Sequence, residues 1–170
     1  MGVDGSMAAR SWHGACSLSR AAILALLVVG SPAAGEWSVK SVPRTDGPGT
    51  RCVVESERQA LPDGYQATTA YVTVDARSVA VTSASNLDPS GGDIGLVVDQ
   101  EALVPMDRLS GRKMALFDSK HARLVELFKA GSRLRVQLRF WPEWPATGTH
   151  SAAFSLIGFT KAYGELAGCR

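Results

Sequence analysis

Two cysteines, Cys52 and Cys169, are the residues whose chemistry can be predicted most directly from this sequence. They stand near the two ends of the region that follows residue 35, and neither belongs to a Cys-x-x-Cys pair of the kind found in redox-active sites. Two thiols in an oxidising compartment usually pair. We therefore expect a structural disulfide between them, which contributes roughly 4–5 kcal/mol in the chain-entropy model. Two free thiols, or pairing with another chain, are the alternatives.

A row of arginines is the second feature with recognisable chemistry. Arg133, Arg135 and Arg139 occupy odd-numbered positions in a segment whose even-numbered positions are apolar. On a strand such side chains share one face and lie about 7 Å apart at neighbouring positions. The row could contact an anionic envelope polymer, lipid phosphates or an acidic protein. The alternative is a solvated outer face whose arginines pair with Asp or Glu side chains of a neighbouring strand.

Two tryptophans follow the arginine row directly. Trp141 and Trp144 belong to a Trp-Pro-Glu-Trp-Pro turn, in which the two prolines stiffen the backbone. Trp and Arg are enriched in binding hot spots. We predict that the turn and the arginine row together bind a partner, either an unknown protein or an anionic envelope component. The alternative for Trp141 is that it covers the core, because it continues a strand.

The other polar residues match no catalytic or metal-binding motif. His121 and His150 lack metal-ligand spacing, and no Gly-x-Ser-x-Gly segment surrounds the serines that follow His150. Asp88, Asp93 and Asp99 flank a Pro-Gly loop but lack the spacing of a calcium loop. We expect His121 to pack on a helix face and the aspartates to hold turns. We also expect no catalytic residue, no cofactor and no metal.

Residues 1–35 have the order of a secretory signal. Arg20 precedes an apolar run that is interrupted by Pro32 and followed by small residues. The run is shorter than the ~20 apolar residues that a membrane-spanning helix needs. We expect cleavage after Gly35, no stable transmembrane anchor afterwards, and a single β-rich domain of residues 36–170 that is periplasmic, secreted or on the outer surface. An uncleaved anchor or a cytoplasmic protein are the alternatives.

The charge balance of the chain argues against nucleic acid as a partner. The formal net charge of the whole chain is +2. The leader contains Arg10, Arg20 and Asp4, so its removal lowers this charge by one. A net charge so close to zero provides no overall attraction to nucleic acid or to membranes.

Most of the region after residue 35 has the two-residue period of strands. Residues 68–75 and 78–84 are rich in β-branched side chains and are separated by two residues, which favours an antiparallel pair. Residues 133–141 form the clearest strand, with Leu, Val and Phe at alternate positions. We predict a mainly β fold, either an antiparallel β-sandwich or a β-rich α+β single domain.

Two short helices are expected beside these strands. Residues 119–130 have an apolar stripe of helical period, with Asp118 as a suitable N-cap and Gly131 as a suitable end. Residues 159–167 predict a second, final helix just before Cys169. We expect the first helix to cover one end or edge of a sheet, because its outer face is charged.

Several segments carry a resemblance to a known family. They are Trp37, Cys52, the loop and strand of residues 89–99, the helix and glycine of residues 124–131, and the closing Phe154-Ser-Leu-Ile-Gly-Phe-Thr-Lys-Ala-Tyr163. In this order they resemble the invasion-associated locus B family of bacterial secreted proteins. The chain departs from that pattern in residues 106–118, which lack the extra cysteines that the family usually has before its amphipathic helix.

The resemblance implies an exported, β-rich, non-catalytic protein linked to the bacterial envelope or to host contact. It implies no catalytic residues. We therefore expect a protein that acts by binding an envelope or host partner. The alternatives are a periplasmic structural or chaperone-like component with an apolar groove, and a hydrolase of unrecognised type.

The leader provides a first test. We predict that the exported protein begins at Glu36, because the small residues before it fit the cleavage site of a signal. Intact mass measurement of protein recovered from the periplasm or the medium should show the loss of residues 1–35. Recovery of the chain from the cytosol with these residues still attached would contradict the prediction.

Overall fold

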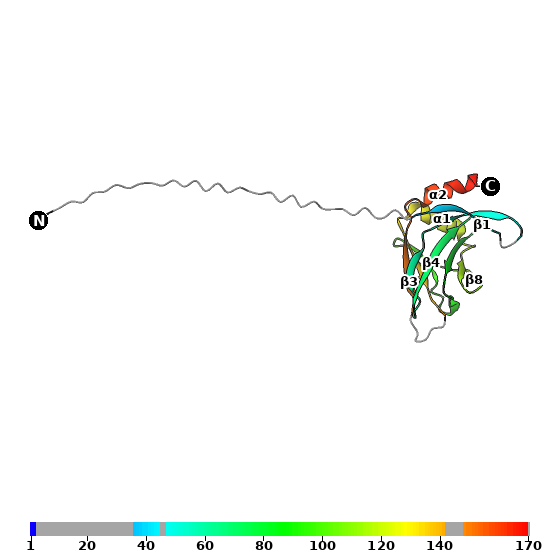
Figure 1. Cartoon of the computed structure of the whole chain (residues 1–170), viewed down its shortest axis with the longest axis horizontal. Helices are drawn as coiled ribbons and strands as arrows, with labels where there is room; N and C mark the ends of the chain where they lie inside the picture. Colours follow the sequence, from blue (N-terminus) through cyan, green and yellow to red (C-terminus); the bar gives the residue numbers. More distant parts are fainter. Residues whose placement is uncertain (3–35, 45–46, 142–147, 170) are drawn as a thin grey trace. The chain divides into compact units, whose positions relative to one another are not determined.

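The computed structural model describes residues 1–2, 36–44, 47–141 and 148–169 (Figure 1). Almost all of the expected leader and the whole of Trp144 therefore lie outside the described residues. The strands are β1 (Ser38–Pro43), β2 (Thr50–Glu55), β3 (Gln59–Pro62), β4 (Ala67–Val74), β5 (Val79–Ser83), β6 (Gly95–Val98), β7 (Val104–Pro105), β8 (Arg108–Ser110), β9 (Met114–Leu116), β10 (Arg133–Leu138) and β11 (His150–Ser155). The helices are α1 (His121–Ala130) and α2 (Phe159–Glu165), with short 3₁₀ turns η1 (Pro89–Gly91) and η2 (Leu166–Gly168).

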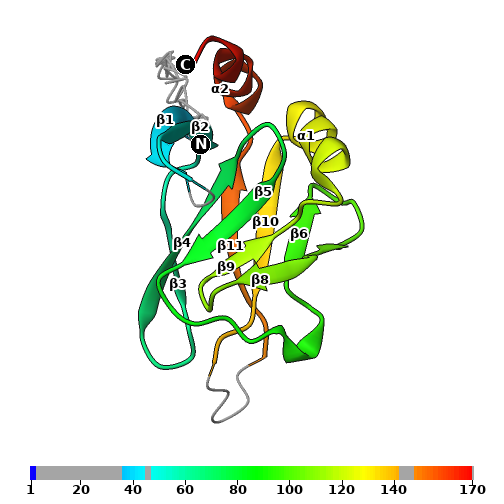
Figure 2. The same ribbon diagram turned by 90° about the vertical axis from the view of Figure 1, so that its right-hand side faces the viewer.

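These strands form two antiparallel sheets (Figure 2). The order in the larger sheet is β1-β2-β4-β5-β9-β8, with β3 also paired to β4, and the order in the smaller sheet is β11-β10-β6-β7. Buried side chains of both sheets and both helices belong to one hydrophobic core. The prediction of a mainly β, antiparallel fold with two short helices is confirmed.

The core follows from the alternation of the strands. In β4 the side chains of Ala70, Val72 and Val74 are completely buried, whereas the residues between them face outward. The expected antiparallel pairing of β4 with β5 places Val72 opposite Val81. In β10 the even-numbered residues are likewise completely buried. One face of each strand therefore faces the core and the other faces solvent.

An aromatic cluster joins the helices to the sheets. The ring centroids of Trp37 and Phe128 lie 5.1 Å and 5.3 Å from that of Phe159, both in edge-to-face arrangements. The indole nitrogen of Trp37 donates a hydrogen bond of 2.7 Å to the carbonyl of Ser155 at the end of β11. These contacts hold α1, α2 and the start of the described domain together at one end of the sheets (Figure 2).

The start of α1 differs from the sequence-based expectation. Asp118 does not cap the helix, which begins after Lys120 without a side-chain capping bond. The carboxylate of Asp118 instead accepts a hydrogen bond of 2.7 Å from Arg108. The turn before α1 is held by Asp107, which accepts hydrogen bonds from the backbone N–H and the hydroxyl of Ser119. The prediction of Asp118 as N-cap is wrong, because a tertiary partner from β8 competes for its carboxylate.

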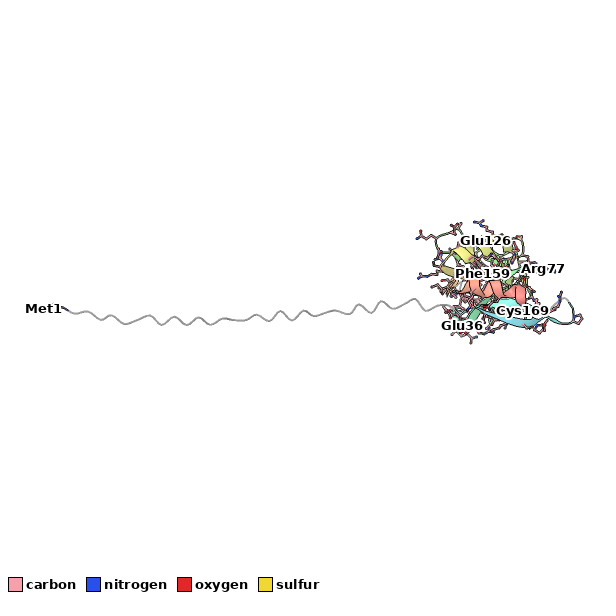
Figure 3. The ribbon with its side chains drawn as sticks, turned by 90° about the horizontal axis from the view of Figure 1, so that it is seen from above. Met1, Glu36, Arg77, Glu126, Phe159 and Cys169 are labelled. Atoms are coloured by element: carbon pink, nitrogen blue, oxygen red, sulfur yellow. A yellow bond between two sulfur atoms is a disulfide. The ribbon has the colours of Figure 1, made fainter. Side chains whose placement is uncertain are left out.

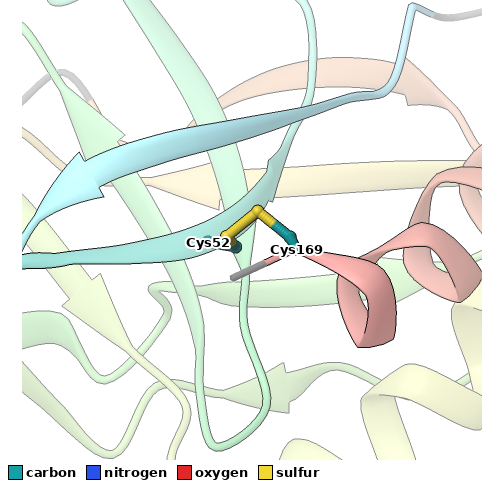
Figure 4. Close-up of a disulfide and its surroundings, with 2 residues drawn as sticks. All are labelled: Cys52 and Cys169. Atoms are coloured by element: carbon teal, nitrogen blue, oxygen red, sulfur yellow. A yellow bond between two sulfur atoms is a disulfide. The ribbon is translucent and has the colours of Figure 1, made fainter.

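The disulfide between Cys52 and Cys169 is present, as predicted. It joins β2 to the residue that follows η2, and the two Cα atoms lie 6.1 Å apart (Figures 3 and 4). This separation is in the usual range for disulfides. The bridge spans 117 residues and fixes the C-terminal end of the described domain to the larger sheet.

Gly131 ends α1, as predicted, but for a packing reason rather than a conformational one. Its backbone is extended and does not adopt the left-handed conformation. A Cβ atom at this position would lie 2.4 Å from a methyl carbon of Val98 and 2.9 Å from the carbonyl oxygen of Leu127. Glycine is therefore needed because the chain passes very close to β6.

Substitution by alanine should have opposite effects on stability at Gly131, which has close neighbours, and at Gly164, which has none. Gly131→Ala should lower the free energy of unfolding by about 1–3 kcal/mol, because the added methyl group overpacks the contact with Val98. Gly164→Ala, in α2, should raise it by about 0.5–1 kcal/mol, because no atom lies within 4 Å of the new Cβ and alanine favours helix. Urea unfolding of both variants measures the difference. Equal effects would contradict the packing explanation.

Candidate functional site

Two arginines of the predicted row lie open on the outer face of the smaller sheet. Arg133 and Arg135 are exposed, and in the pairing of β10 with β11 they lie opposite Ser155 and Ala153. These neighbours have short side chains, so they do not cover the guanidinium groups. Within the part of the chain that the structure describes, neither arginine has an acidic side chain as a partner.

The third arginine of the row, Arg139, has a different role. Its Nε donates a hydrogen bond of 3.0 Å to one carboxylate oxygen of Asp93, and its Nη2 donates one of 2.6 Å to the other. The hydroxyl of Thr149 also donates to Asp93. The bonds from Arg139, and to a lesser degree that from Thr149, lower the pKa of Asp93 to about 2. Arg139 therefore fastens the loop before β6 to the end of β10.

Trp141 lies on the surface at the end of this strand. Its side chain is 59% exposed, while the neighbouring Phe140 is buried and forms a β-bridge with Leu87. The backbone N–H of Trp141 donates a hydrogen bond of 2.9 Å to the carbonyl of Asn86. The alternative that Trp141 covers the core is wrong, because the strand period places Phe140 inward and Trp141 outward.

The exposed indole borders a hollow of about 300 Å³. The hollow is lined by Asn86, Leu87, Asp88, Pro89, Leu109, Arg112 and Trp141. Leu109 belongs to β8 of the larger sheet and Arg112 to the β8–β9 turn, whereas Trp141 follows the end of β10. Sequence reasoning missed these two residues, because nothing in their local pattern connects them to Trp141.

Two of the three aspartates that flank the Pro-Gly loop hold turns, as expected. Asp88 accepts a hydrogen bond of 3.0 Å from the N–H of Ser90 and caps η1. Asp99 has a positive φ of 49° and accepts hydrogen bonds from the N–H groups of Ser132 and Arg133. Asp93 is engaged by Arg139. In the described ranges no group of three or more His, Cys, Asp or Glu residues is arranged to hold a metal ion.

Neither histidine lines this hollow. His121 is half-buried on α1, and its Nε2 lies 2.9 Å from the backbone carbonyl of Asp75. The ring of His150 packs against Phe140, with 5.7 Å between centroids. His121 therefore contacts the β4–β5 turn through a ring nitrogen.

Comparison with known proteins identifies the fold. No family model and no curated protein matches the sequence. Among solved structures, the chain is similar to the crystal structure of invasion-associated protein B from Bartonella henselae, with a TM-score of 0.51 and 18% sequence identity. The match covers 81% of this chain and 95% of the other. At this identity the likeness concerns the fold, which is β-rich like that of the invasion-associated protein.

One further structural finding bears on the membrane. No helix among the described residues is long and apolar enough to cross a bilayer.

The ion pair of Asp93 predicts a pH-dependent contribution to stability. The carboxyl titrates near 3.9 in an unfolded chain and at about 2 in the fold, so its ionised form stabilises the fold above pH ~4. This contribution is lost as the pH falls through the folded value. Asp93→Asn should therefore lower the free energy of unfolding by about 1–2 kcal/mol at pH 6 and by much less near pH 2.

Chemical denaturation at a series of pH values measures this difference. Glu126→Gln, on the exposed face of α1, is the control, because its ion pair with Lys129 is on the surface and contributes little at any pH. A loss of stability in Asp93→Asn that stays constant from pH 6 to pH 2 would contradict the role given to Arg139.

Proposed function

We propose that this chain is an exported, non-enzymatic protein of the bacterial envelope that acts by binding an envelope or host partner. The observation that carries the proposal is the exposed Trp141 beside a hollow to which Arg112 also contributes. Large aromatic and arginine side chains of this kind dominate binding energy in known interfaces. The function is of the type expected for proteins that resemble the invasion-associated locus B family.

Three observations support export to the periplasm or the outer surface. Residues 1–35 have the order of a secretory signal. The disulfide between Cys52 and Cys169 fits an oxidising compartment, because structural disulfides are rare in the cytosol. The fold is similar to that of invasion-associated protein B, whose name links that protein to invasion.

The proposed binding surface has an aromatic part and a cationic part. Trp141 offers an amphipathic ring at the edge of the hollow, and Arg112 offers a charge next to it. Arg133 and Arg135 extend the cationic character along the outer face of β10. Arg139 supports this surface rather than contacting the partner, because its charge is already paired with Asp93. A partner with acidic or phosphate groups and an apolar patch matches this combination.

The apolar lining of the hollow also favours a second candidate function. Leu87, Pro89 and Leu109 give it the character of a small groove, which would suit a structural or chaperone-like component of the periplasm. Such a protein should copurify with lipid or with an apolar peptide. A hydrolase would instead need a histidine, a carboxylate and a hydroxyl within hydrogen-bond reach of one another.

The proposal predicts that Trp141→Ala and Arg135→Ala each weaken partner capture roughly tenfold without changing the fold. The expected loss reflects the removal of an anchoring side chain worth about 1–2 kcal/mol. Crosslinking of the exported protein in its own cells, followed by pull-down, measures the captured amount. Thermal unfolding should show unchanged stability, because neither side chain contributes to the core.

Two variants serve as matched controls. Tyr65→Ala removes another aromatic side chain that is 59% exposed, in the β3–β4 turn. Arg123→Ala removes an exposed arginine on α1. Both should capture the partner as the unaltered protein does. If all four variants behave alike, the surface around Trp141 is not the binding site.

A further inference from the structure

A second pocket lies beside the disulfide, away from the hollow at Trp141. It has a volume of about 550 Å³, which is in the range of small-molecule sites. Its walls come from the β1–β2 hairpin, the β4–β5 turn, the residue before the turn into α1, and the C-terminal end of the described domain. The lining residues are Arg44, Arg51, Cys52, Asp75, Ala76, Arg77, Ser78, Asp118, Leu166 and Cys169.

One carboxylate of the pocket, that of Asp75, already accepts several hydrogen bonds from neighbouring residues. One of its oxygens accepts hydrogen bonds of 2.8 Å from the N–H groups of Arg77 and Ser78 and a further bond from the hydroxyl of Ser78. Its other oxygen accepts a hydrogen bond from Nη1 of Arg51. Asp75 therefore holds the β4–β5 turn and orients Arg51, and it has little capacity left for another donor.

The second carboxylate, Asp118, is paired outside the pocket. Its oxygen accepts a hydrogen bond of 2.7 Å from Arg108 of β8. Arg51 and Arg77 contribute guanidinium groups to the same lining. The side chain of Arg77 is exposed at the rim, and its backbone N–H alone is used by Asp75.

Arg51 keeps unused hydrogen-bonding capacity. A guanidinium group has five N–H donors. Here Nη1 is bound to Asp75, and the buried Nε has no acceptor among the described residues. The side chain is 39% exposed, and Arg51 is one of the residues that line the pocket. A cationic group held in place with donors to spare is suited to accept an anionic ligand.

We infer that this pocket binds a small organic anion through a phosphate or carboxylate group. Arg51 and Arg77 hydrogen-bond the anionic oxygens, because a guanidinium fork matches both groups. The apolar part of the ligand contacts Leu166, Ala76 and the disulfide, which form the less polar side of the pocket. This site is separate from the surface proposed above and does not depend on it.

The disulfide makes the site sensitive to redox conditions. Cys169 forms part of the pocket wall and is held against β2 by its bond to Cys52 (Figure 4). Two-electron reduction by a dithiol converts the bond into two thiols and oxidises the reductant to its disulfide. The end of the chain after η2 then loses its covalent attachment. Ligand affinity is consequently lower in the reduced protein.

NMR titration of the mature, oxidised protein with phenyl phosphate and, separately, benzoate tests the inference at constant ionic strength. The two probes distinguish a phosphate from a carboxylate ligand. Saturable shifts of the amide signals of Arg77, Ser78 and Cys169 with either probe support the site. Arg77→Ala should weaken binding about tenfold, because hydrogen bonds to charged groups are strong. Reduction with dithiothreitol should also weaken it.

Arg123→Ala is the control for a general effect of charge, because this arginine is exposed on α1 and lies outside the pocket. It should bind the probes with unchanged affinity. The absence of saturable shifts with both probes would overturn the inference. So would equal weakening in Arg77→Ala and Arg123→Ala, because the probes would then respond only to net charge.

Discussion

The structure depends on the two-faced character of β10. Because side chains alternate along a strand, burial of Leu134, Val136 and Leu138 forces the residues between them to the outer face. A shift of one residue would place arginines in the core and leucines in water, so the register is strongly determined. The same alternation continues past the end of the strand, where it buries Phe140 and exposes Trp141. Core and candidate binding surface are therefore two consequences of one pattern.

Aspartate carboxylates hold the loops and turns that connect the strands and helices. Asp99 caps the connection between α1 and β10, Asp107 holds the turn before α1, and Asp75 holds the β4–β5 turn. Asp93 is bound by Arg139 and fixes the loop before β6. In each case an aspartate side chain accepts hydrogen bonds from backbone or guanidinium donors that would otherwise lack a partner. The carboxylates that flank the Pro-Gly loop therefore have structural roles as hydrogen-bond acceptors.

Different interactions hold the lining residues of the two candidate sites in place. The hollow at Trp141 is formed where residues 86–89 and Trp141 meet β8 and the β8–β9 turn of the larger sheet. The pocket beside the disulfide depends on a covalent bond that draws the C-terminal end of the described domain against β2. The first is therefore maintained by packing and backbone hydrogen bonds. The second requires an oxidising environment, which agrees with the proposed export of the protein.

The sequence by itself determined the strand faces, the two helices, the cysteine pair and the exposed position of Arg133 and Arg135. These features follow from local periodicity, or from there being just two cysteines after residue 35, and they need no knowledge of distant contacts. The tertiary structure decided the roles of individual polar groups. Arg139 pairs with Asp93, as the alternative for the arginine row allowed, and Asp118 pairs with Arg108 although its position indicated an N-cap.

The tertiary structure also creates both pockets, because their lining residues are distant in the sequence. Leu109 and Arg112 reach Trp141, and Arg51 and Arg77 reach Cys169, only through the order of strands in the sheets. The physical reason is that burial acts on a repeating pattern that can be read along the chain. A hydrogen bond or ion pair acts over a few ångströms in space, between residues whose proximity the fold creates.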